Sequence, residues 1–399
     1  MGIKSQATCL ASLLGLLTLA QAGAAQDRTS LFPLTTDNIH LEMVFNFDQQ
    51  DLSKETGAVD LVWGSSSATE PPGMYNSAYI PYAEDNYGYS ISWYQANHPD
   101  WLEYRCDKKT LAFEFGSTTL APLDFANPEV QQFQWTNWVD TPLAQGYRGI
   151  AVDTMDLTND WGRCGHFSSS GAWVKQYLGK PSDAAFRRDV LAWESATYQH
   201  VKEYSSTATV QVNVSYQFGQ PVADNQQLMT MTDLLFDERG FTNWGDGSQV
   251  TPSEWATIVK NVLYVQSKGS CYMTNGEEPG PSSKITQQQR LWVIANYLLV
   301  RNDCTYMYMS GFKGKQQDYG RLILFPEYSI QIGHPTAAMA KTQGVWERPY
   351  SNGLTLVNPF NRTATVKLPA GSWVDVNGAP VGTPVKLPQQ TGLVLLLAP

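Results

Sequence analysis

Short apolar runs alternate along this chain with longer stretches in which apolar residues recur at helical spacing. The run 150–152 is too short for a helix and lacks polar alternation, so it predicts a strand that is buried on both faces. It follows Gly149 and ends at a carboxylate, Asp153. The run 233–238 repeats the pattern, because its apolar residues also end in acids. Two buried strands that end in carboxylates are therefore the main features of the pattern.

Eight runs of this kind are separated by helical or irregular stretches. The predicted strands are 41–47, 59–64, 101–105, 150–152, 208–214, 233–238, 270–275 and 304–309. The predicted helices are 86–97, 127–145, 171–178, 182–204, 221–231, 285–301 and one that begins at Thr251. Alternation in this order is typical of an α/β fold with a parallel sheet, and eight strands predict a (β/α)8 TIM barrel. We place this barrel at residues 36–342.

Two long loops interrupt the alternation. The stretch 65–82 is rich in Ser, Pro, Gly and Tyr and predicts a loop above the barrel. Loops of this length are uncommon unless they are functional, so Tyr75, Tyr79 and Tyr82 could line a cleft there. A second loop, rich in Gly and Ser, is predicted at 157–170.

The pattern of apolar and polar residues changes near residue 343. Four apolar runs, 353–359, 364–368, 373–376 and 392–397, alternate with turn sequences such as Asn-Gly and Gly-Ala-Pro, and no helical period remains. This pattern predicts a small antiparallel, β-sandwich-like domain at residues 343–399.

The N-terminus has the three parts of a secretory signal peptide, which we place at residues 1–24. Lys4 supplies the positive charge, 10–20 the apolar run, and 20–22 or 22–24 a small-residue cleavage site. The apolar run is too short to span a bilayer, and no other stretch reaches the required length of about 18 apolar residues. We therefore expect an exported protein, extracellular or periplasmic, without membrane insertion.

The composition narrows the class of partner. With 27 basic and 37 acidic residues the chain carries a net charge of −10, which disfavours binding to nucleic acid or to anionic membranes. Charged residues make up only 16% of the chain, whereas it holds 13 Trp and 20 Tyr. Most of these aromatic side chains must fill the core, but a low-charge, aromatic-rich surface also suits stacking on neutral polysaccharide.

Four cysteines remain once Cys9 leaves with the signal peptide. An even number in an exported chain favours disulfides, and three pairings are possible. We prefer Cys106–Cys164 and Cys271–Cys304, because the latter two begin adjacent predicted strands. Free buried thiols are the alternative. Neither Cys-x-x-Cys nor His-Glu-x-x-His occurs, so the common zinc motifs are absent.

Hydrolysis of a glycosidic bond requires two carboxyl groups, one to protonate the leaving oxygen and one to attack carbon or activate water. Asp153 and Glu238 end predicted strands four and six, which are close neighbours around the barrel rim. We therefore expect both to be catalytic. The alternative is that each only caps a helix or accepts hydrogen bonds within its own loop.

Other polar and aromatic residues near strand ends or in the loops are candidates for sugar binding. They are Asn46, Trp63, Asp156, Asn213, Tyr216, Asp237, Trp244, Asn275 and Tyr306. Trp161 and His166 follow strand four and are expected to be structural. A metal site from Asp153, Asp156 and His166 stays open as an alternative, although its spacing matches no common motif. No Gly-x-Ser-x-Gly motif or glycine-rich phosphate loop occurs, and we expect no cofactor.

Several of these motifs resemble those of a family of (β/α)8 barrels catalogued as hypothetical glycoside hydrolases. The resemblance covers about residues 40–360 and rests on Leu-Asp-Phe-Ala-Asn-Pro-Glu at 123–129, Gly-Tyr-Arg-Gly-Ile-Ala-Val-Asp at 146–153, Glu238, and the tail 346–359. More distantly, the layout is similar to α-galactosidase-like and polygalactosaminidase-like barrels. These resemblances imply that Asp153 is the nucleophile or base and Glu238 the acid/base. Many relatives carry Asn directly after the strand-four Asp, where this chain has Thr154.

The sequence thus predicts an exported, monomeric glycoside hydrolase that acts on a polysaccharide or oligosaccharide without a cofactor. Two alternatives stay open. One is a barrel that binds glycan without cleaving it, as part of a surface polysaccharide system. The other is metal-dependent hydrolysis.

Overall fold

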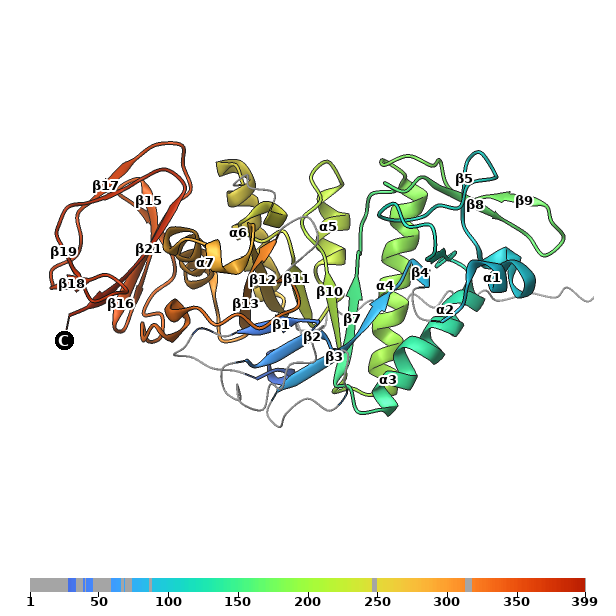
Figure 1. The fold of residues 1–399 in the computed structure, drawn as a ribbon, viewed down its shortest axis with the longest axis horizontal. Coiled ribbons are helices and arrows are strands. Elements are labelled where there is room, and N and C mark those ends of the chain that lie inside the picture. The colour runs from blue at the N-terminus through green and yellow to red at the C-terminus, as the bar shows by residue number, and fades with distance from the viewer. Residues whose placement is uncertain are drawn as a thin grey trace, which may run out of the picture.

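The computed structural model describes residues 28–33, 39, 41–45, 59–65, 68, 74–85, 88–245, 250–312 and 318–398. The predicted signal peptide and Asn46 lie outside these residues. Figure 1 shows a central barrel with the C-terminal β strands at one end and a segment that carries β4, β5, β8 and β9 at the other.

Eight parallel strands form the barrel. In spatial order they are β1 (Glu42–Val44), β2 (Leu61–Ser65), β3 (Tyr75–Pro81), β7 (Gly149–Asp153), β10 (Thr209–Asn213), β11 (Leu234–Asp237), β12 (Cys271–Pro279) and β13 (Thr305–Phe312). Each strand pairs with the next in parallel. A parallel bridge between Leu41 and Met307 joins the first strand to the last, so the sheet curls round on itself. The predicted α/β barrel is confirmed.

The third barrel strand is not the predicted one. β3 lies within the stretch 65–82 that the sequence predicts as a loop, and the predicted strand 101–105 instead contributes β5 (Tyr104–Arg105) to a separate sheet. The reason is that β3 carries polar residues that turn inward. Ser77 is completely buried in the barrel and donates a hydrogen bond to Gln211 Oε1 at 3.0 Å. A strand whose buried positions are filled by hydrogen-bonded polar residues has no apolar pattern to reveal it.

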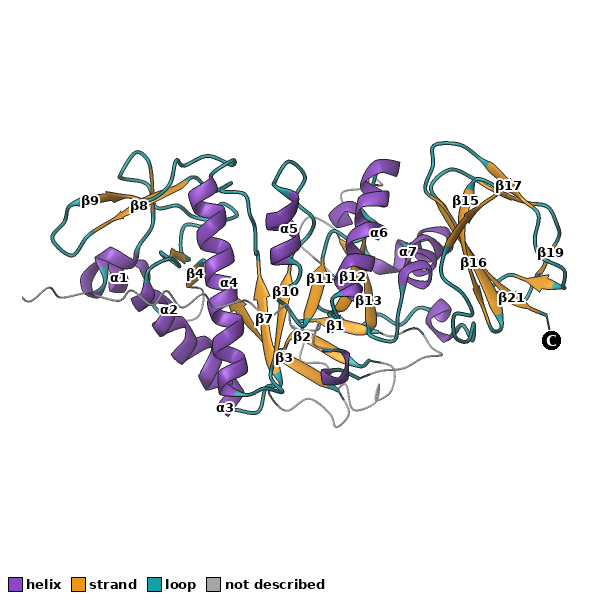
Figure 2. Ribbon diagram, turned by 180° about the vertical axis from the view of Figure 1, so that it is seen from behind, coloured by secondary structure: helices purple, strands orange, loops and turns teal. Residues whose placement is uncertain are grey.

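Helices lie along the outside of the barrel beside the strands β7 to β13 (Figure 2). They are α2 (Pro128–Gln134), which continues through η4 (Trp135–Asp140) into α3 (Thr141–Ala144), α4 (Ala184–Tyr204), α5 (Val222–Leu228), α6 (Pro252–Ser267) and α7 (Gln287–Val300). Asn127 caps α2, and its side chain accepts from the backbone N–H of Glu129. Thr251 and Glu254 form a reciprocal capping box that starts α6. These helix starts agree with the sequence prediction.

Two long segments, which follow β3 and β7, pack together beside the carboxyl ends of the barrel strands. They contain β4 (Glu84–Asp85), α1 (Ile91–Asn97), η3 (Pro99–Trp101), β5, β6 (Ala121–Pro122), β8 (Arg163–Phe167) and β9 (Trp173–Lys175). We call residues 82–127 and 156–183 together the side segment. The predicted loop 157–170 is wrong in part, because it contains β8, and the predicted helix 171–178 is wrong, because it contains β9, the antiparallel partner of β8.

A buried arginine organises the side segment. The guanidinium of Arg163 bonds to Glu103 at 2.6 Å and to Glu114 at 2.8 Å. It also donates to the backbone carbonyls of Ala83 and Leu123. This one side chain therefore holds both insertions together, and the adjacent disulfide Cys106–Cys164 adds a covalent link between them.

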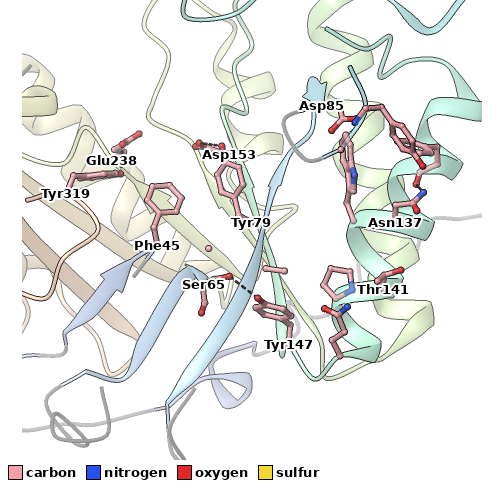
Figure 3. A pocket seen from close by; sticks show the side chains of 18 residues that line it. Phe45, Ser65, Tyr79, Asp85, Asn137, Thr141, Tyr147, Asp153, Glu238 and Tyr319 are labelled. Carbon is pink, nitrogen blue, oxygen red and sulfur yellow. Dashed lines mark hydrogen bonds between the residues drawn. The ribbon is translucent and has the colours of Figure 1, made fainter. Parts of the chain in front are cut away.

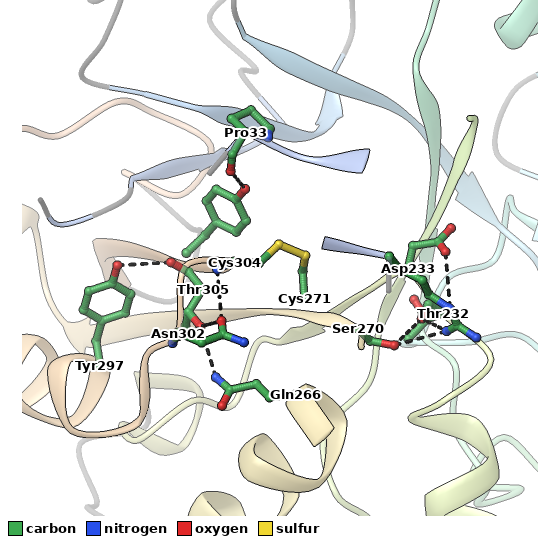
Figure 4. The surroundings of a disulfide bond; sticks show 12 residues. Pro33, Thr232, Asp233, Gln266, Ser270, Cys271, Tyr297, Asn302, Cys304 and Thr305 are labelled. Carbon is green, nitrogen blue, oxygen red and sulfur yellow. Dashed lines mark hydrogen bonds and ion pairs between the residues drawn. A yellow bond between two sulfur atoms is a disulfide. The ribbon is translucent and has the colours of Figure 1, made fainter. Parts of the chain in front are cut away.

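The second disulfide, Cys271–Cys304, joins the start of β12 to the residue before β13 (Figure 4). Asn302 supports this corner, because its Oδ1 accepts from the backbone N–H of Cys304 and from the hydroxyl of Thr305. Both preferred cysteine pairings are formed, and the alternative of free thiols is wrong.

The chain ends in antiparallel sheets. The larger sheet contains β14 (Ala340–Thr342), β15 (Val345–Tyr350), β16 (Gly353–Asn358), β21 (Thr391–Leu397), β18 (Trp373–Val374) and β19 (Pro380–Val381), and β17 (Ala364–Val366) pairs with β20 (Val385–Leu387). Gly392 lies directly on α7, where an added Cβ would sit 2.5 Å from the carbonyl of Leu291. This close approach packs the C-terminal strands against the barrel. The boundary at residue 343 stays a prediction.

Among the described helices, none is long and apolar enough to cross a membrane.

Candidate active site

Two carboxylates meet at the rim of the barrel. Asp153 is the last residue of β7, and Glu238 directly follows β11. Asn213 ends β10, the strand between them, and its Nδ2 donates to Asp153 Oδ1 at 2.7 Å and to Glu238 Oε2 at 2.9 Å. These two distances add up to 5.6 Å, which is the largest separation that the two carboxylate oxygens can have.

Three donors surround the carboxylate of Asp153. Besides Asn213, the hydroxyl of Tyr79 donates to Oδ2 at 2.9 Å and the backbone N–H of Thr154 donates to Oδ1 at 2.9 Å. Burial raises the pKa of Asp153, while all three hydrogen bonds favour the ionised form and oppose that rise. The three donors thus limit how far burial raises the pKa of Asp153.

Glu238 is held differently. The hydroxyl of Tyr319 donates to its Oε1 at 2.5 Å, opposite the bond from Asn213 to Oε2. Burial raises the pKa of Glu238 to about 7, and the nearby charge of Asp153 adds to this rise. Glu238 therefore keeps a proton up to neutral pH.

Two cavities open on either side of this pair, and Tyr79, Asp153 and Glu238 border both. The first has a volume of about 900 Å³ and runs from Phe45 and Tyr319 past Tyr79 toward η4 and α3 (Figure 3). The second, of about 750 Å³, lies between the barrel rim and the side segment. A carbohydrate that reaches the carboxylates has room in either.

Five of the sequence candidates do gather at this place. Asn213 bridges the pair, and Asp156, Tyr216 and Trp244 line the second cavity. Asp237 lies just before Glu238 but points away from the cavities, since its buried carboxylate accepts from the hydroxyls of Ser215 and Tyr272. Its contacts are those of a residue that fixes the strand end.

Three candidates lie too deep to touch a substrate. Trp63 is completely buried in the barrel interior against Phe236. Asn275 donates to Glu277, and Tyr306 donates to the carbonyl of Pro33. The structure therefore corrects their predicted role in sugar binding. For Asn275 and Tyr306 the reason is strand length, because β12 and β13 run on to Pro279 and Phe312, well beyond the predicted strand ends.

Of the two tyrosines that donate to the carboxylates, the sequence analysis names one and misses the other. Tyr79 is predicted to line a cleft, although from a loop and not from β3. Tyr319 lies beyond the last barrel strand, where no periodicity or motif points to it. The sequence analysis therefore misses Tyr319.

Four of the eight described non-glycine residues with a positive φ line the cavities. Phe45, Phe115, Thr154 and Trp244 have φ between 49° and 66°, in the left-handed region that non-glycine residues seldom adopt. All four line one cavity or the other. Strain of this kind clusters at functional sites, where the surrounding structure holds the backbone in place.

The alternative metal site does not assemble. His166 lies in β8, and its Nδ1 is 3.0 Å from Asp124 Oδ2 within the side segment. Across the part of the chain that the structure describes, no group of three or more His, Cys, Asp or Glu side chains is arranged to hold a metal ion. The structural role expected for His166 stays a prediction.

The (β/α)8 barrel and a match to a glycosyl hydrolase family model together define the class of protein, a glycoside hydrolase. The chain belongs to hypothetical glycosyl hydrolase family 15, whose family model matches residues 74–354. No curated protein matches the chain.

Solved α-amylases have a similar fold. The α-amylase from H. orenii has a TM-score of 0.51 at 11% identity, over 91% of this chain and 100% of that one. A maltogenic α-amylase, AmyB from Thermotoga neapolitana, has a TM-score of 0.49 at 10% identity, over 90% of this chain and 97% of that one. At 11% identity the similarity to the H. orenii enzyme supports the fold alone.

Proposed function

We propose that the protein is an exported hydrolase that cleaves O-glycosidic bonds of a polysaccharide or oligosaccharide, with Asp153 as nucleophile and Glu238 as acid/base. The single amide of Asn213, shared between the two carboxylates, carries this proposal. The two oxygens that this amide bonds, Asp153 Oδ1 and Glu238 Oε2, are at most 5.6 Å apart, the sum of 2.7 Å and 2.9 Å. Retaining glycosidases hold their carboxyl groups about 5–5.5 Å apart and inverting enzymes about 6.5–9.5 Å apart, so the short distance favours retention.

The reaction then has two steps. Protonated Glu238 gives its proton to the leaving oxygen while ionised Asp153 attacks the anomeric carbon, which breaks the glycosidic bond and forms a glycosyl ester. Glu238, now ionised, takes a proton from water, and the resulting hydroxide displaces Asp153 from the sugar. Tyr79 stabilises the charge on Asp153 before attack, and Tyr319 holds Glu238 in orientation.

Export is the second part of the proposal. The residues 1–24 carry the features of a signal peptide, and the two disulfides are of the kind that persists outside the reducing cytosol. Mass spectrometry of protein from the culture medium or periplasm tests this. An N-terminus near residue 25 and intact disulfides are expected, whereas a full-length cytosolic chain contradicts export.

The enzymatic part is tested by a reducing-sugar screen on a panel of polysaccharides. We expect wild-type activity to fall at least about 10²-fold in both Asp153→Asn and Glu238→Gln. Glu203→Gln, an exposed carboxyl on α4, is the matched control and should remain fully active. Activity that survives both site variants contradicts the assignment, and glycan binding without any cleavage favours the non-catalytic barrel.

The stereochemistry is tested on the same substrate. Proton NMR of the first product should show the anomer of the bond that was cleaved, before mutarotation. Release of the opposite anomer contradicts the role of Asp153 as nucleophile and makes it the base of an inverting reaction. Activity that is unchanged by a chelator is also expected, whereas its abolition favours metal-dependent hydrolysis.

A further inference from the structure

The side segment supplies a wall of the second cavity that plays no part in the proposed reaction. Asp153 and Glu238 line this cavity from the barrel rim, and Phe115 lines it from the side segment. Among the large apolar side chains of the described residues, that of Phe115 has the largest exposed fraction, 69%. It also belongs to none of the hydrophobic clusters in that part of the chain. Packing therefore does not explain why an aromatic ring stands at this position.

The backbone at Phe115 does not suit a bulky side chain. Residues 114–117 form a tight turn, closed by a hydrogen bond of 2.8 Å from the backbone N–H of Ser117 to the carbonyl of Glu114. The two central residues, Phe115 and Gly116, have φ of 49° and 70°. Two positive φ angles are typical of a type I′ turn, in which Asn, Asp or Gly is preferred at the first central position. Phe115 is thus both exposed and strained, which favours a role in function over a role in folding.

A second ring lies against Phe115. Trp161 belongs to the other half of the side segment, and the two ring centroids are 4.8 Å apart with the ring planes at 55°. Trp161 is half-buried, and its neighbour in the chain, Asp160, lines the second cavity. Phe115 and Trp161 therefore form one aromatic surface at the edge of this cavity, which we call the aromatic platform.

Buried hydrogen bonds fix the two turns that carry the aromatic platform. The carboxylate of Glu114 pairs with the guanidinium of Arg163 at 2.8 Å. The side chain of Asn159 accepts from the backbone N–H of Arg163 and donates to its carbonyl, both at 2.8 Å, so it closes the turn that holds Trp161. Both rings are thus attached to backbone that the same buried residue holds. A surface that is already ordered loses little conformational entropy when it binds a ligand.

We propose that the aromatic platform stacks on a sugar unit of the substrate that lies beyond the unit at the cleaved bond. The proposal rests on the proposed function and narrows its substrate to a chain long enough to reach from Asp153 and Glu238 across the second cavity. The unit bound there presents the apolar C–H face of its ring, because that face is what an aromatic side chain can remove from water. Trp161, which the sequence predicts to be structural, takes part in this binding.

Kinetics as a function of chain length test the aromatic platform. The polysaccharide that the wild type cleaves best is compared with its shortest oligomer that is still cleaved. In Phe115→Ala and Trp161→Ala, KM for the polysaccharide should rise about tenfold with little change in kcat, because the lost contact is made equally in the ground state and the transition state. For the shortest oligomer, kcat/KM should stay within about twofold of the wild type, since this substrate does not reach the platform. Tyr204→Ala is the control and should change neither value, because Tyr204 is an exposed ring on α4 that lines neither cavity.

Phe115→Asn separates binding from folding. Asn adopts a positive φ more readily than Phe, so this variant should melt at or above the temperature of the wild type. It should nevertheless show the same rise in KM for the polysaccharide. A lower melting temperature together with an unchanged KM would make Phe115 a structural residue and overturns the proposal.

The remaining outcomes distinguish the aromatic platform from the hydrolase function. Cleavage with a KM for the polysaccharide that is unchanged in both alanine variants, or with equal losses on long and short substrates, overturns the platform and leaves the hydrolase function standing. A wild type that cleaves no glycan contradicts the hydrolase function, and affinity electrophoresis in gels that contain each polysaccharide then tests the platform alone. Retardation of the wild type that Phe115→Ala loses supports the platform, whereas retardation that persists in this variant, or none in any gel, overturns it.

Discussion

Tyr319 donates a hydrogen bond of 2.5 Å to Oε1 of Glu238, from a segment beyond the last strand of the barrel. Asn213 donates to the other oxygen, so both carboxylate oxygens are held while the group is buried. Burial raises the pKa of Glu238 to about 7 in spite of these two bonds. A carboxyl group that is fixed in orientation and still protonated near neutral pH has what a general acid requires.

The first prediction concerns the pH profile of the wild type. The value of kcat/KM should fall as the pH rises through about 7, because Glu238 then loses the proton that it must give to the leaving group. On the acid side, activity should fall where Asp153 becomes protonated and can no longer attack. Initial rates between pH 3 and 10, in buffers of constant ionic strength, measure both limbs. Activity that stays level to pH 9 contradicts Glu238 as the acid.

Tyr319→Phe provides the second prediction. The hydrogen bond from Tyr319 lowers the pKa of Glu238, so its removal should move the alkaline limb to higher pH. The loss of orientation should also reduce kcat by about tenfold, while KM changes little. The control is Tyr264→Phe on α6, a position remote from both cavities. An unchanged alkaline limb in Tyr319→Phe would show that this bond does not tune the acid.

The sequence predicts the parts of this site that lie on strands whose buried residues are apolar. β7 and β11 are apolar until they end in acids, so Asp153 and Glu238 could be placed on the rim from sequence. β3 fills its inward positions with hydrogen-bonded polar residues, so the strand is missed although Tyr79 is noticed.

The remaining errors concern contacts that local sequence does not encode. Tyr319 bonds Glu238 from a segment that follows the last barrel strand, 81 residues further along the chain. Trp63 and Tyr306 carry sugar-binding chemistry but lie in the interior cluster of the barrel. Their depth follows from where each strand ends, and apolar patterns place such boundaries only to within a few residues.

Thr154 gives the third prediction. Its φ is 58°, a left-handed conformation that a β-branched residue adopts only under strain and that Asn tolerates better. Thr154→Asn should raise the free energy of unfolding by about 1 kcal/mol in urea denaturation. Activity should persist, because the backbone N–H that bonds Asp153 is kept.

The control for this change is Thr207→Asn, in an exposed loop without a positive φ. It should leave the free energy of unfolding within about 0.5 kcal/mol of the wild type. A destabilised Thr154→Asn variant would show that the threonine side chain makes a stabilising contact that outweighs the backbone strain.

Arg163 gives the last prediction, which tests what holds the side segment together beside the second cavity. Arg163→Leu leaves Glu103 and Glu114 buried without their shared cation, and burial already holds the pKa of Glu103 at about 8. The free energy of unfolding, measured by urea denaturation, should fall by about 3–5 kcal/mol, as for other broken buried ion pairs. This loss of stability should grow as the pH rises above about 8, because Arg163 lowers the pKa of Glu103 and its removal makes that buried carboxyl harder to ionise in the folded protein. Arg188→Leu is the control, because it removes a guanidinium that is 71% exposed. The free energy of unfolding of this variant should fall by less than about 1 kcal/mol. Equal losses in the two variants would mean that Arg163 is a packing residue and that the side segment owes its position to the disulfide Cys106–Cys164 instead.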